Sequence, residues 1–214
     1  QTIKRLAAES NGKISCVLTI HQPNTRILEL FDHLLLLVDG EYFDIKGICW
    51  NPIPKGQRHP EGLPFLTDGP AYDLEFIERD LKLISEAGFN TLRPYKVILD
   101  EKVLNLIDSY NLKVIIPVFN FHKITLGEVE EALAVLMHHP TSLFWEIGNE
   151  WNYNLLYNPA GDFEETVVRI QEVITTIRSS GSTLPLAINY GELPTKEIEA
   201  RFDVDLWGLN IYRS

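Results

Sequence analysis

The stretch Ser142-Leu-Phe-Trp-Glu-Ile-Gly-Asn-Glu-Trp-Asn152 determines how the rest of the chain is interpreted. Residues 143–147 form an apolar run that predicts a strand buried on both faces, which is typical of a parallel sheet. The run ends abruptly in the polar residues 149–152, so these follow the carboxyl end of the strand. In α/β barrels the chemistry takes place at that end. We therefore expect a functional site around Glu150.

The residues around Glu150 suggest which chemistry this site performs. Asn149 supplies an amide donor directly before the carboxylate, and Trp145 and Trp151 lie on either side of it in the sequence. A glutamate in this setting suits protonation of a glycosidic oxygen beside a stacked sugar ring. The alternative is that Glu150 is a loop carboxylate that caps the following helix.

Composition limits the classes of partner. The 214 residues carry a formal net charge of −11 and contain no basic run, which argues against a nucleic-acid or anionic-membrane partner. No apolar stretch is long enough for a membrane span, and the amino terminus has no signal-peptide pattern. Cys16 and Cys49 lie far apart in apolar runs and match no metal-ligand spacing, so we expect them to be buried and expect no metal or other cofactor.

Strand and helix patterns alternate along most of the chain. This spacing predicts parallel βα units with right-handed crossovers. Asp39-Gly40 is a two-residue hairpin signal that pairs residues 34–38 antiparallel with 42–46. The other expected strands are 14–20, 43–49, 90–95, 113–119, 143–147, 184–190 and 205–212, and the expected helices are 2–10, 25–31, 73–87, 101–110, 127–137, 163–179 and 195–201.

The segment VLTIHQPNTRILELFDHLLLLVDG, residues 17–40, resembles the switch-histidine segment of ABC-transporter nucleotide-binding domains of subfamily G. The resemblance implies that His21 corresponds to the histidine that contacts the γ-phosphate of ATP. However, no G-x-x-x-x-G-K-[ST] loop occurs in the sequence, so the elements that would hold the phosphates are missing. We therefore interpret His21 as a structural residue.

Five later segments resemble the TIM-barrel glycoside hydrolases of clan A, most closely the β-glucanase and glucanosyltransferase types. They are FDIKGICWNPIPKG, DLKLISEAGFNTLRPY, LKVIIPVFN, LFWEIGNEWN and DLWGLNIYRS, and the similarity covers residues 36–214. The resemblance implies a carbohydrate substrate similar to β-glucan. It also implies that Glu150 is the general acid/base and that Asn149 holds the 2-hydroxyl group of the sugar.

The same resemblance assigns substrate-binding roles at other strand ends. Arg93 would brace the nucleophile, although an ordinary ion pair is an equally common reading of such a residue. Trp50, Asn51 and Trp151 lie where they could contact a sugar, and Tyr212 would line the site from the end of the sixth barrel strand. The alternative for the tryptophans is a place in the core, which we favour for Trp207.

One essential group of the family has no counterpart in the sequence. Retaining glycosidases need a second carboxylate about 5–5.5 Å from the first. The family carries it after the seventh strand in a Thr/Ser-Glu-Phe-Gly context, whereas the barrel pattern here runs only to a sixth strand. Glu146 and Glu192 are the remaining candidates, and neither matches that context. We therefore expect the chain alone to be inactive on natural substrates.

These patterns predict an α/β fold, namely a partial or permuted (β/α)8 TIM-type barrel. An α-β-α-β segment at 1–38 precedes six barrel βα units at 39–214, forming one compact unit. Residues 14–20 and 34–38 could instead fill the seventh and eighth barrel places, but the short Asp39-Gly40 turn favours a hairpin at the barrel floor and an open sheet. Open edges favour a homo-oligomer. The other functions left open are a non-catalytic carbohydrate-binding or engineered scaffold protein and a nucleotide-binding transporter fragment.

Overall fold

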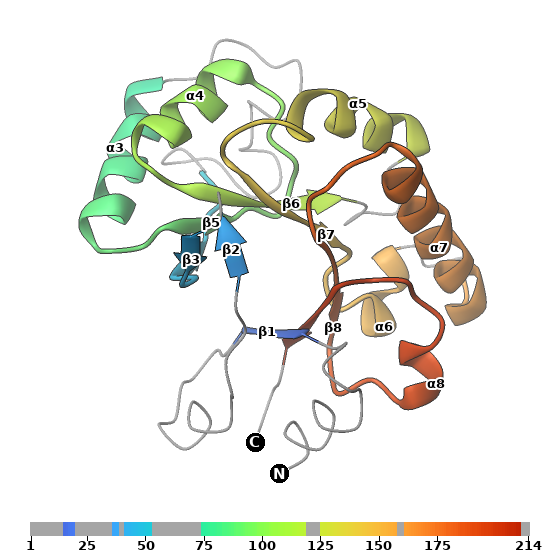
Figure 1. Cartoon of the computed structure of the whole chain (residues 1–214). Coiled ribbons are helices and arrows are strands. Elements are labelled where there is room, and N and C mark those ends of the chain that lie inside the picture. The colour runs from blue at the N-terminus through green and yellow to red at the C-terminus, as the bar shows by residue number, and fades with distance from the viewer. Residues whose placement is uncertain are drawn as a thin grey trace, which may run out of the picture.

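A curled parallel sheet forms a partial barrel (Figure 1). The computed structural model describes residues 15–19, 36–38, 41–52, 74–118, 125–157 and 161–210. The sheet contains, in spatial order, β1 (Ser15–Thr19), β9 (Leu206–Asn210), β8 (Leu186–Tyr190), β7 (Ser142–Ile147), β6 (Lys113–Val118), β5 (Thr91–Arg93) and β4 (Gly47–Cys49). All neighbouring strands are parallel. The predicted fold class, a partial TIM-type barrel, is confirmed.

Helices cover the convex face of this sheet, as Figure 1 shows. They are α3 (Leu74–Glu86), α4 (Glu101–Ser109), α5 (Leu126–Leu136), α7 (Phe163–Ser179) and the short α8 (Lys196–Glu199). Each long helix buries one apolar stripe; in α3 the stripe is Ile77, Leu81 and Ile84. Helix α5 begins with a capping box in which Thr125 and Glu128 satisfy each other's backbone N–H groups. These helices and their boundaries agree closely with the sequence predictions.

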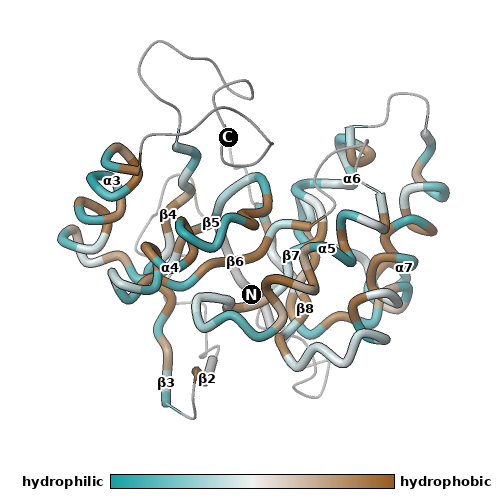
Figure 2. Tube along the Cα trace, turned by 90° about the horizontal axis from the view of Figure 1, so that it is seen from above, coloured by the Kyte–Doolittle hydropathy of each residue, from teal (hydrophilic) through white to brown (hydrophobic). Residues whose placement is uncertain are grey.

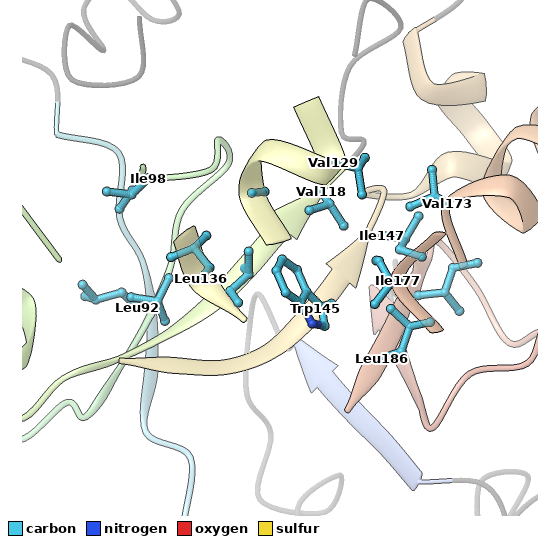
Figure 3. Close-up of a cluster of buried hydrophobic side chains, with 14 of the residues drawn as sticks. Leu92, Ile98, Val118, Val129, Leu136, Trp145, Ile147, Val173, Ile177 and Leu186 are labelled. Atoms are coloured by element: carbon cyan, nitrogen blue, oxygen red, sulfur yellow. The ribbon is translucent and has the colours of Figure 1, made fainter. Parts of the chain in front are cut away.

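The main core lies between the sheet and the helices. In Figure 3 Trp145 lies at its centre, with Ile147 of the same strand close by. Because strand side chains alternate between faces, Phe144 and Glu146 project from the opposite, concave face. Phe144 belongs to a smaller inner cluster of Ile115, Leu143, Phe144, Ala187 and Leu206. The barrel interior is thus apolar near the start of the strands and polar further along them.

An antiparallel hairpin packs against this inner cluster. It consists of β2 (Leu36–Val38) and β3 (Glu41–Phe43), with Leu36 opposite Phe43, as the Asp39-Gly40 signal predicted. Val38, Phe43 and Ile45 contact the inner cluster. Figure 2 shows the hairpin at one end of the barrel, opposite α6 (Trp151–Asn154). The hairpin therefore covers the amino-terminal floor, where the sequence analysis placed it.

Strand β1 shows which arrangement of the amino-terminal strands is correct. It pairs in parallel with β9, Ser15 opposite Leu206, and thus occupies the seventh place of the barrel order. The arrangement in which residues 14–20 fill the seventh barrel place, which the sequence disfavoured, is therefore right for β1. Strand β2 pairs with β3 and does not fill the eighth barrel place. Among the described strands, β1 and β4 form the two edges of the sheet. The division of the chain at residue 38 stays a prediction.

Two smaller expectations need correction. Residues 43–49 do not form one continuous strand, because the chain leaves the hairpin after Phe43 and resumes extended pairing only in β4. Cys49 is exposed, not buried, because alternation in this short edge strand turns its side chain away from the helix-side core. The predicted helices 2–10 and 25–31, and His21, lie outside the described residues.

Candidate active site

The backbone turns sharply where β7 ends. Gly148 has φ of +67°, and Glu150 itself adopts a left-handed conformation with φ of 52° and ψ of 40°. A left-handed conformation is costly for a residue with a side chain, and such strain is concentrated at functional sites. Glu150 precedes α6, but its side chain makes no capping hydrogen bond to that helix. Helix capping, the alternative role for Glu150, therefore does not explain why a glutamate stands at this position.

Two asparagines from neighbouring strands hold Glu150. The Glu150 N–H donates to Oδ1 of Asn189 at 3.0 Å, and Nδ2 of Asn210 donates to the Glu150 carboxylate at 2.9 Å. Asn189 in β8 and Asn210 in β9 are both almost fully buried. Three adjacent strand ends thus fix both the backbone and the carboxylate of one residue.

A buried ion pair lies deeper in the barrel interior. Nε of Arg93 lies 3.0 and 2.9 Å from the two carboxylate oxygens of Glu146, and both side chains are less than a tenth exposed. Burial alone would lower the pKa of Arg93, but the negative charge and hydrogen bonds of Glu146 outweigh burial and raise it. The guanidinium therefore remains charged at all accessible pH values.

Arg93 connects this ion pair to the candidate site. Nη2 of Arg93 donates to Oδ1 of Asn149 at 2.9 Å, and Nδ2 of Asn210 lies 3.5 Å from the same oxygen. The backbone oxygen of Asn149 accepts a hydrogen bond from Asn154. Since its Oδ1 accepts these bonds, the side-chain NH₂ group of Asn149 is oriented away from Arg93. The family resemblance implied that Arg93 braces the nucleophile, whereas the carboxylate that Arg93 holds here is Glu146. The bracing of a nucleophile stays a prediction.

The predicted tryptophan contacts need correction. Trp50 is 5% exposed and its Nε1 donates to Asp80 at 3.5 Å. Trp151 is fully buried and packs against Phe163, Tyr190 and Phe202. Both rings supply core volume on the helix side of the sheet and have no face free for a sugar. Trp207, expected in the core, is buried as predicted.

The other predicted contact residues have different outcomes. Asn51 lies after β4, where its Oδ1 accepts the Tyr95 N–H at 3.2 Å and so links two strand ends. Tyr212 lies outside the described residues, because β9 is described only to Asn210. Glu192 follows β8 and is exposed.

Asn189 and Asn210 were missed in the sequence. Each is a polar residue in an otherwise apolar strand. Since side chains alternate between the two faces of a strand, each stands at a position that faces the barrel interior, and this was the available signal. Each keeps one buried amide atom, Nδ2 of Asn189 and Oδ1 of Asn210, without a hydrogen-bond partner in the described part of the chain. Buried polar atoms of this kind require an explanation, and a ligand or ordered water would provide one.

Comparisons with known proteins agree with this architecture. No protein-family model and no curated protein matches the chain. A glycosyl hydrolase family 2 member from Bacteroides cellulosilyticus DSM 14838 matches in structure with a TM-score of 0.60 at 22% identity, over 80% of this chain and 22% of that one. Apo Bacteroides uniformis β-glucuronidase 3 gives 0.60 at 16% identity, over 81% and 21%. Bacteroides uniformis β-glucuronidase 2, covalently bound to cyclophellitol-6-carboxylate aziridine, gives 0.57 at 18%, over 82% and 22%.

The chain has the fold of glycoside hydrolase barrels. The chain spans about a fifth of the length of these enzymes, and at such identities the likeness concerns the fold alone. The more specific resemblances, to β-glucanases and to an ABC-transporter segment, receive no support from the comparisons.

The described residues limit further assignments at this barrel. No helix in the described ranges is long and apolar enough to cross a membrane. In the same ranges, no cluster of three or more His, Cys, Asp and Glu side chains has an arrangement that could hold a metal ion.

Proposed function

We propose that Glu150 is the general acid/base of a retaining β-glycoside hydrolase or transglycosylase site. The observation that carries this proposal is the fixing of its carboxylate by Asn210 at 2.9 Å and of its backbone by Asn189 at 3.0 Å. A general acid must be held in one position relative to the bond that it protonates. Glu150 is held in this way at the end of a barrel strand where substrates bind in this fold.

The ion pair has a supporting role in this proposal. Arg93 orients Asn149 through a bond of 2.9 Å, and Glu146 fixes Arg93 through two bonds. Asn149 then presents its NH₂ group for the 2-hydroxyl group of the sugar. Hydrogen bonds to that hydroxyl strengthen in the oxocarbenium-like transition state.

A retaining mechanism also needs a second carboxylate that acts as the nucleophile, and no described residue has been assigned to this role. Glu146 is buried and committed to Arg93, so it is a poor nucleophile. The sequence offers no other carboxylate in the expected context. We propose that the 214-residue chain by itself does not turn over natural β-glucans, because removing one of two cooperating catalytic groups costs several orders of magnitude.

A neutral β-linked glucan is the proposed substrate class. The net charge of −11 disfavours an anionic polysaccharide. Two of the similar structures are β-glucuronidases, so β-glucuronides are the second class to assay.

External anions provide a direct test of the role of Glu150. Azide or formate can attack the anomeric carbon in place of a missing carboxylate, so we expect phenyl β-glucoside to react slowly when either is added. Glu150→Gln should abolish this reaction, because a phenoxide leaving group needs protonation. The 2,4-dinitrophenyl glucoside is the control, because its leaving group departs without a proton. Equal losses by Glu150→Gln on both glucosides would contradict proton donation.

The two alternative functions predict different ligands. A non-catalytic carbohydrate-binding or scaffold protein would bind oligosaccharides without any Glu150-dependent reaction. A transporter fragment would bind ATP-Mg. Calorimetry with laminaripentaose and with ATP-Mg separates them, and we expect heat from the sugar alone.

A further inference from the structure

An exposed tyrosine lies directly beside the candidate acid. Because Trp50 and Trp151 are buried, any aromatic contact to a sugar must come from another residue. Tyr153 is 59% exposed, and its backbone N–H donates to the carbonyl oxygen of Glu150 at 2.9 Å. The Tyr153 ring is therefore accessible to a ligand, and its flat apolar face is suited to contact with a sugar ring.

The surface beneath Tyr153 is shaped for its ring. A Cβ atom built on Gly191 would lie 2.2 Å from Cε2 and 2.5 Å from Cδ2 of Tyr153, so the ring occupies the space that any other residue would fill. The Gly191 N–H also donates to Oδ1 of Asn152 at 2.8 Å. The loop after β7 is thereby held against the loop after β8, with the tyrosine between them.

The segment that carries Tyr153 is strained but well anchored. Leu155, Leu156 and Tyr157 all have positive φ, between 49° and 57°. Asn154 donates to the backbone oxygen of Asn149 and accepts the Leu156 N–H, and the Leu156 side chain is buried. Consecutive left-handed residues persist only where surrounding contacts demand them, and they cluster at ligand-binding sites.

We propose that Tyr153, supported by Gly191, is a stacking platform for one neutral sugar ring of a β-linked oligosaccharide, in a subsite next to Glu150. This proposal rests on the proposed function and adds a binding residue to it. The C–H face of a neutral pyranose packs well on a flat aromatic ring. Glu192 follows Gly191 directly, and a uronic acid placed here would meet its negative charge. The site therefore favours neutral sugars.

The charges near Tyr153 agree with this assignment. The pKa of Tyr190 is raised, chiefly by burial and further by Glu192 and Tyr153, which indicates that both side chains lie near the Tyr190 hydroxyl. Glu192 is thus an acidic neighbour of this surface, which suits an uncharged ligand.

Calorimetry of the 214-residue chain with laminaripentaose, cellopentaose and a β-glucuronic acid oligosaccharide tests the proposal. We expect binding of a neutral pentasaccharide, weakened roughly tenfold by Tyr153→Ala and nearly unchanged by Tyr153→Phe, because stacking needs the ring and not the hydroxyl. Gly191→Ala should weaken binding by displacing the ring. Tyr42→Ala is the matched control, since Tyr42 is 56% exposed on β3 at the opposite end of the barrel.

Circular dichroism of each variant excludes unfolding as the cause of lost binding. Absence of binding by the parent chain, equal binding by parent and Tyr153→Ala, or tighter binding of the uronic oligosaccharide would each overturn the proposal. The Glu150→Gln variant separates this proposal from the proposed function. Lost anion-assisted reaction with intact Tyr153-dependent binding supports both, whereas Tyr153-dependent binding without any Glu150-dependent reaction overturns only the catalytic role.

Discussion

The side chain of Asn210 donates a hydrogen bond of 2.9 Å to the carboxylate of Glu150, although the two residues are 60 positions apart in the chain. The same amide nitrogen lies 3.5 Å from Oδ1 of Asn149. Asn210 therefore contacts both residues to which the sequence assigned the chemistry. The end of β9 contributes to the candidate site through this residue, with Tyr212 beyond the described range.

Asn210→Ala should reduce the anion-assisted reaction of phenyl β-glucoside about tenfold or more, because a hydrogen bond to a charged group is worth about 1.5–3 kcal/mol. The measurement is the initial rate with added azide. Asn105→Ala is the control, since Asn105 is exposed on α4. An unchanged rate in Asn210→Ala would show that the bond does not orient Glu150.

Breaking the Arg93–Glu146 pair should destabilise the fold strongly. Glu146→Gln or Arg93→Met leaves one buried charge without its partner, and such losses cost about 3–5 kcal/mol. The double variant Arg93→Met/Glu146→Gln should lose less than the sum of the two single variants, because it leaves no unpaired charge. Urea unfolding measures all three free energies. Additive losses would contradict a direct energetic coupling between the side chains.

Gly208→Ala should impair the site from a distance. A Cβ atom at this position would lie 2.9 Å from Nδ2 of Asn189, the residue that accepts the Glu150 N–H. We expect a loss of about 1–3 kcal/mol in stability from overpacking, together with a slower anion-assisted reaction. Gly47→Ala is the matched control, since its nearest contact would be an ordinary 3.6 Å. Equal behaviour of the two variants would rule out the proposed displacement of Asn189.

Acid should destabilise the fold through His139. Its pKa is lowered from the ordinary value of 6.5, chiefly by burial and further by Lys113, against the opposing charges of Asp108 and Glu101. Because the folded form binds a proton less readily than the unfolded chain, the free energy of unfolding falls as pH drops below about 6.5. Nδ1 of His139 also accepts the Thr141 N–H at 3.3 Å, and protonation ends that bond.

The variant His139→Gln should flatten this dependence between pH 7 and pH 5, as measured by urea unfolding at each pH. The neighbouring His138 is exposed, so His138→Gln is the control and should keep the parent profile. Identical pH profiles for the parent and His139→Gln would show that other groups cause the acid sensitivity.

The two edges of the described sheet should promote association. β1 and β4 lie at the ends of the strand order, and unpaired strand edges expose N–H and C=O groups to other chains. We expect the mass from light scattering to rise with concentration. A monomer at high concentration with a single cooperative melting transition would contradict this prediction.

The sequence by itself determined the local elements and the place of the acid. The apolar run 143–147 predicted a buried strand, and the stripe Ile77, Leu81, Ile84 predicted helix α3, because the two periodicities are local properties of the chain. The position of Glu150 after that strand followed from the same pattern. Asp39-Gly40 likewise predicted the hairpin, whose pairing needs only residues close in sequence.

Only the tertiary structure decided what surrounds Glu150. Asn189 and Asn210 reach it across 39 and 60 residues, and β1 joins β9 from the other end of the chain. Parallel pairing brings together strands that are distant in sequence, so a local pattern carries no information on which strand ends become neighbours. The environments of Trp151 and Tyr153 depend in the same way on residues later in the chain. Trp151 packs against Phe163, and the ring of Tyr153 lies against Gly191, so neither environment could be predicted from the order of residues alone.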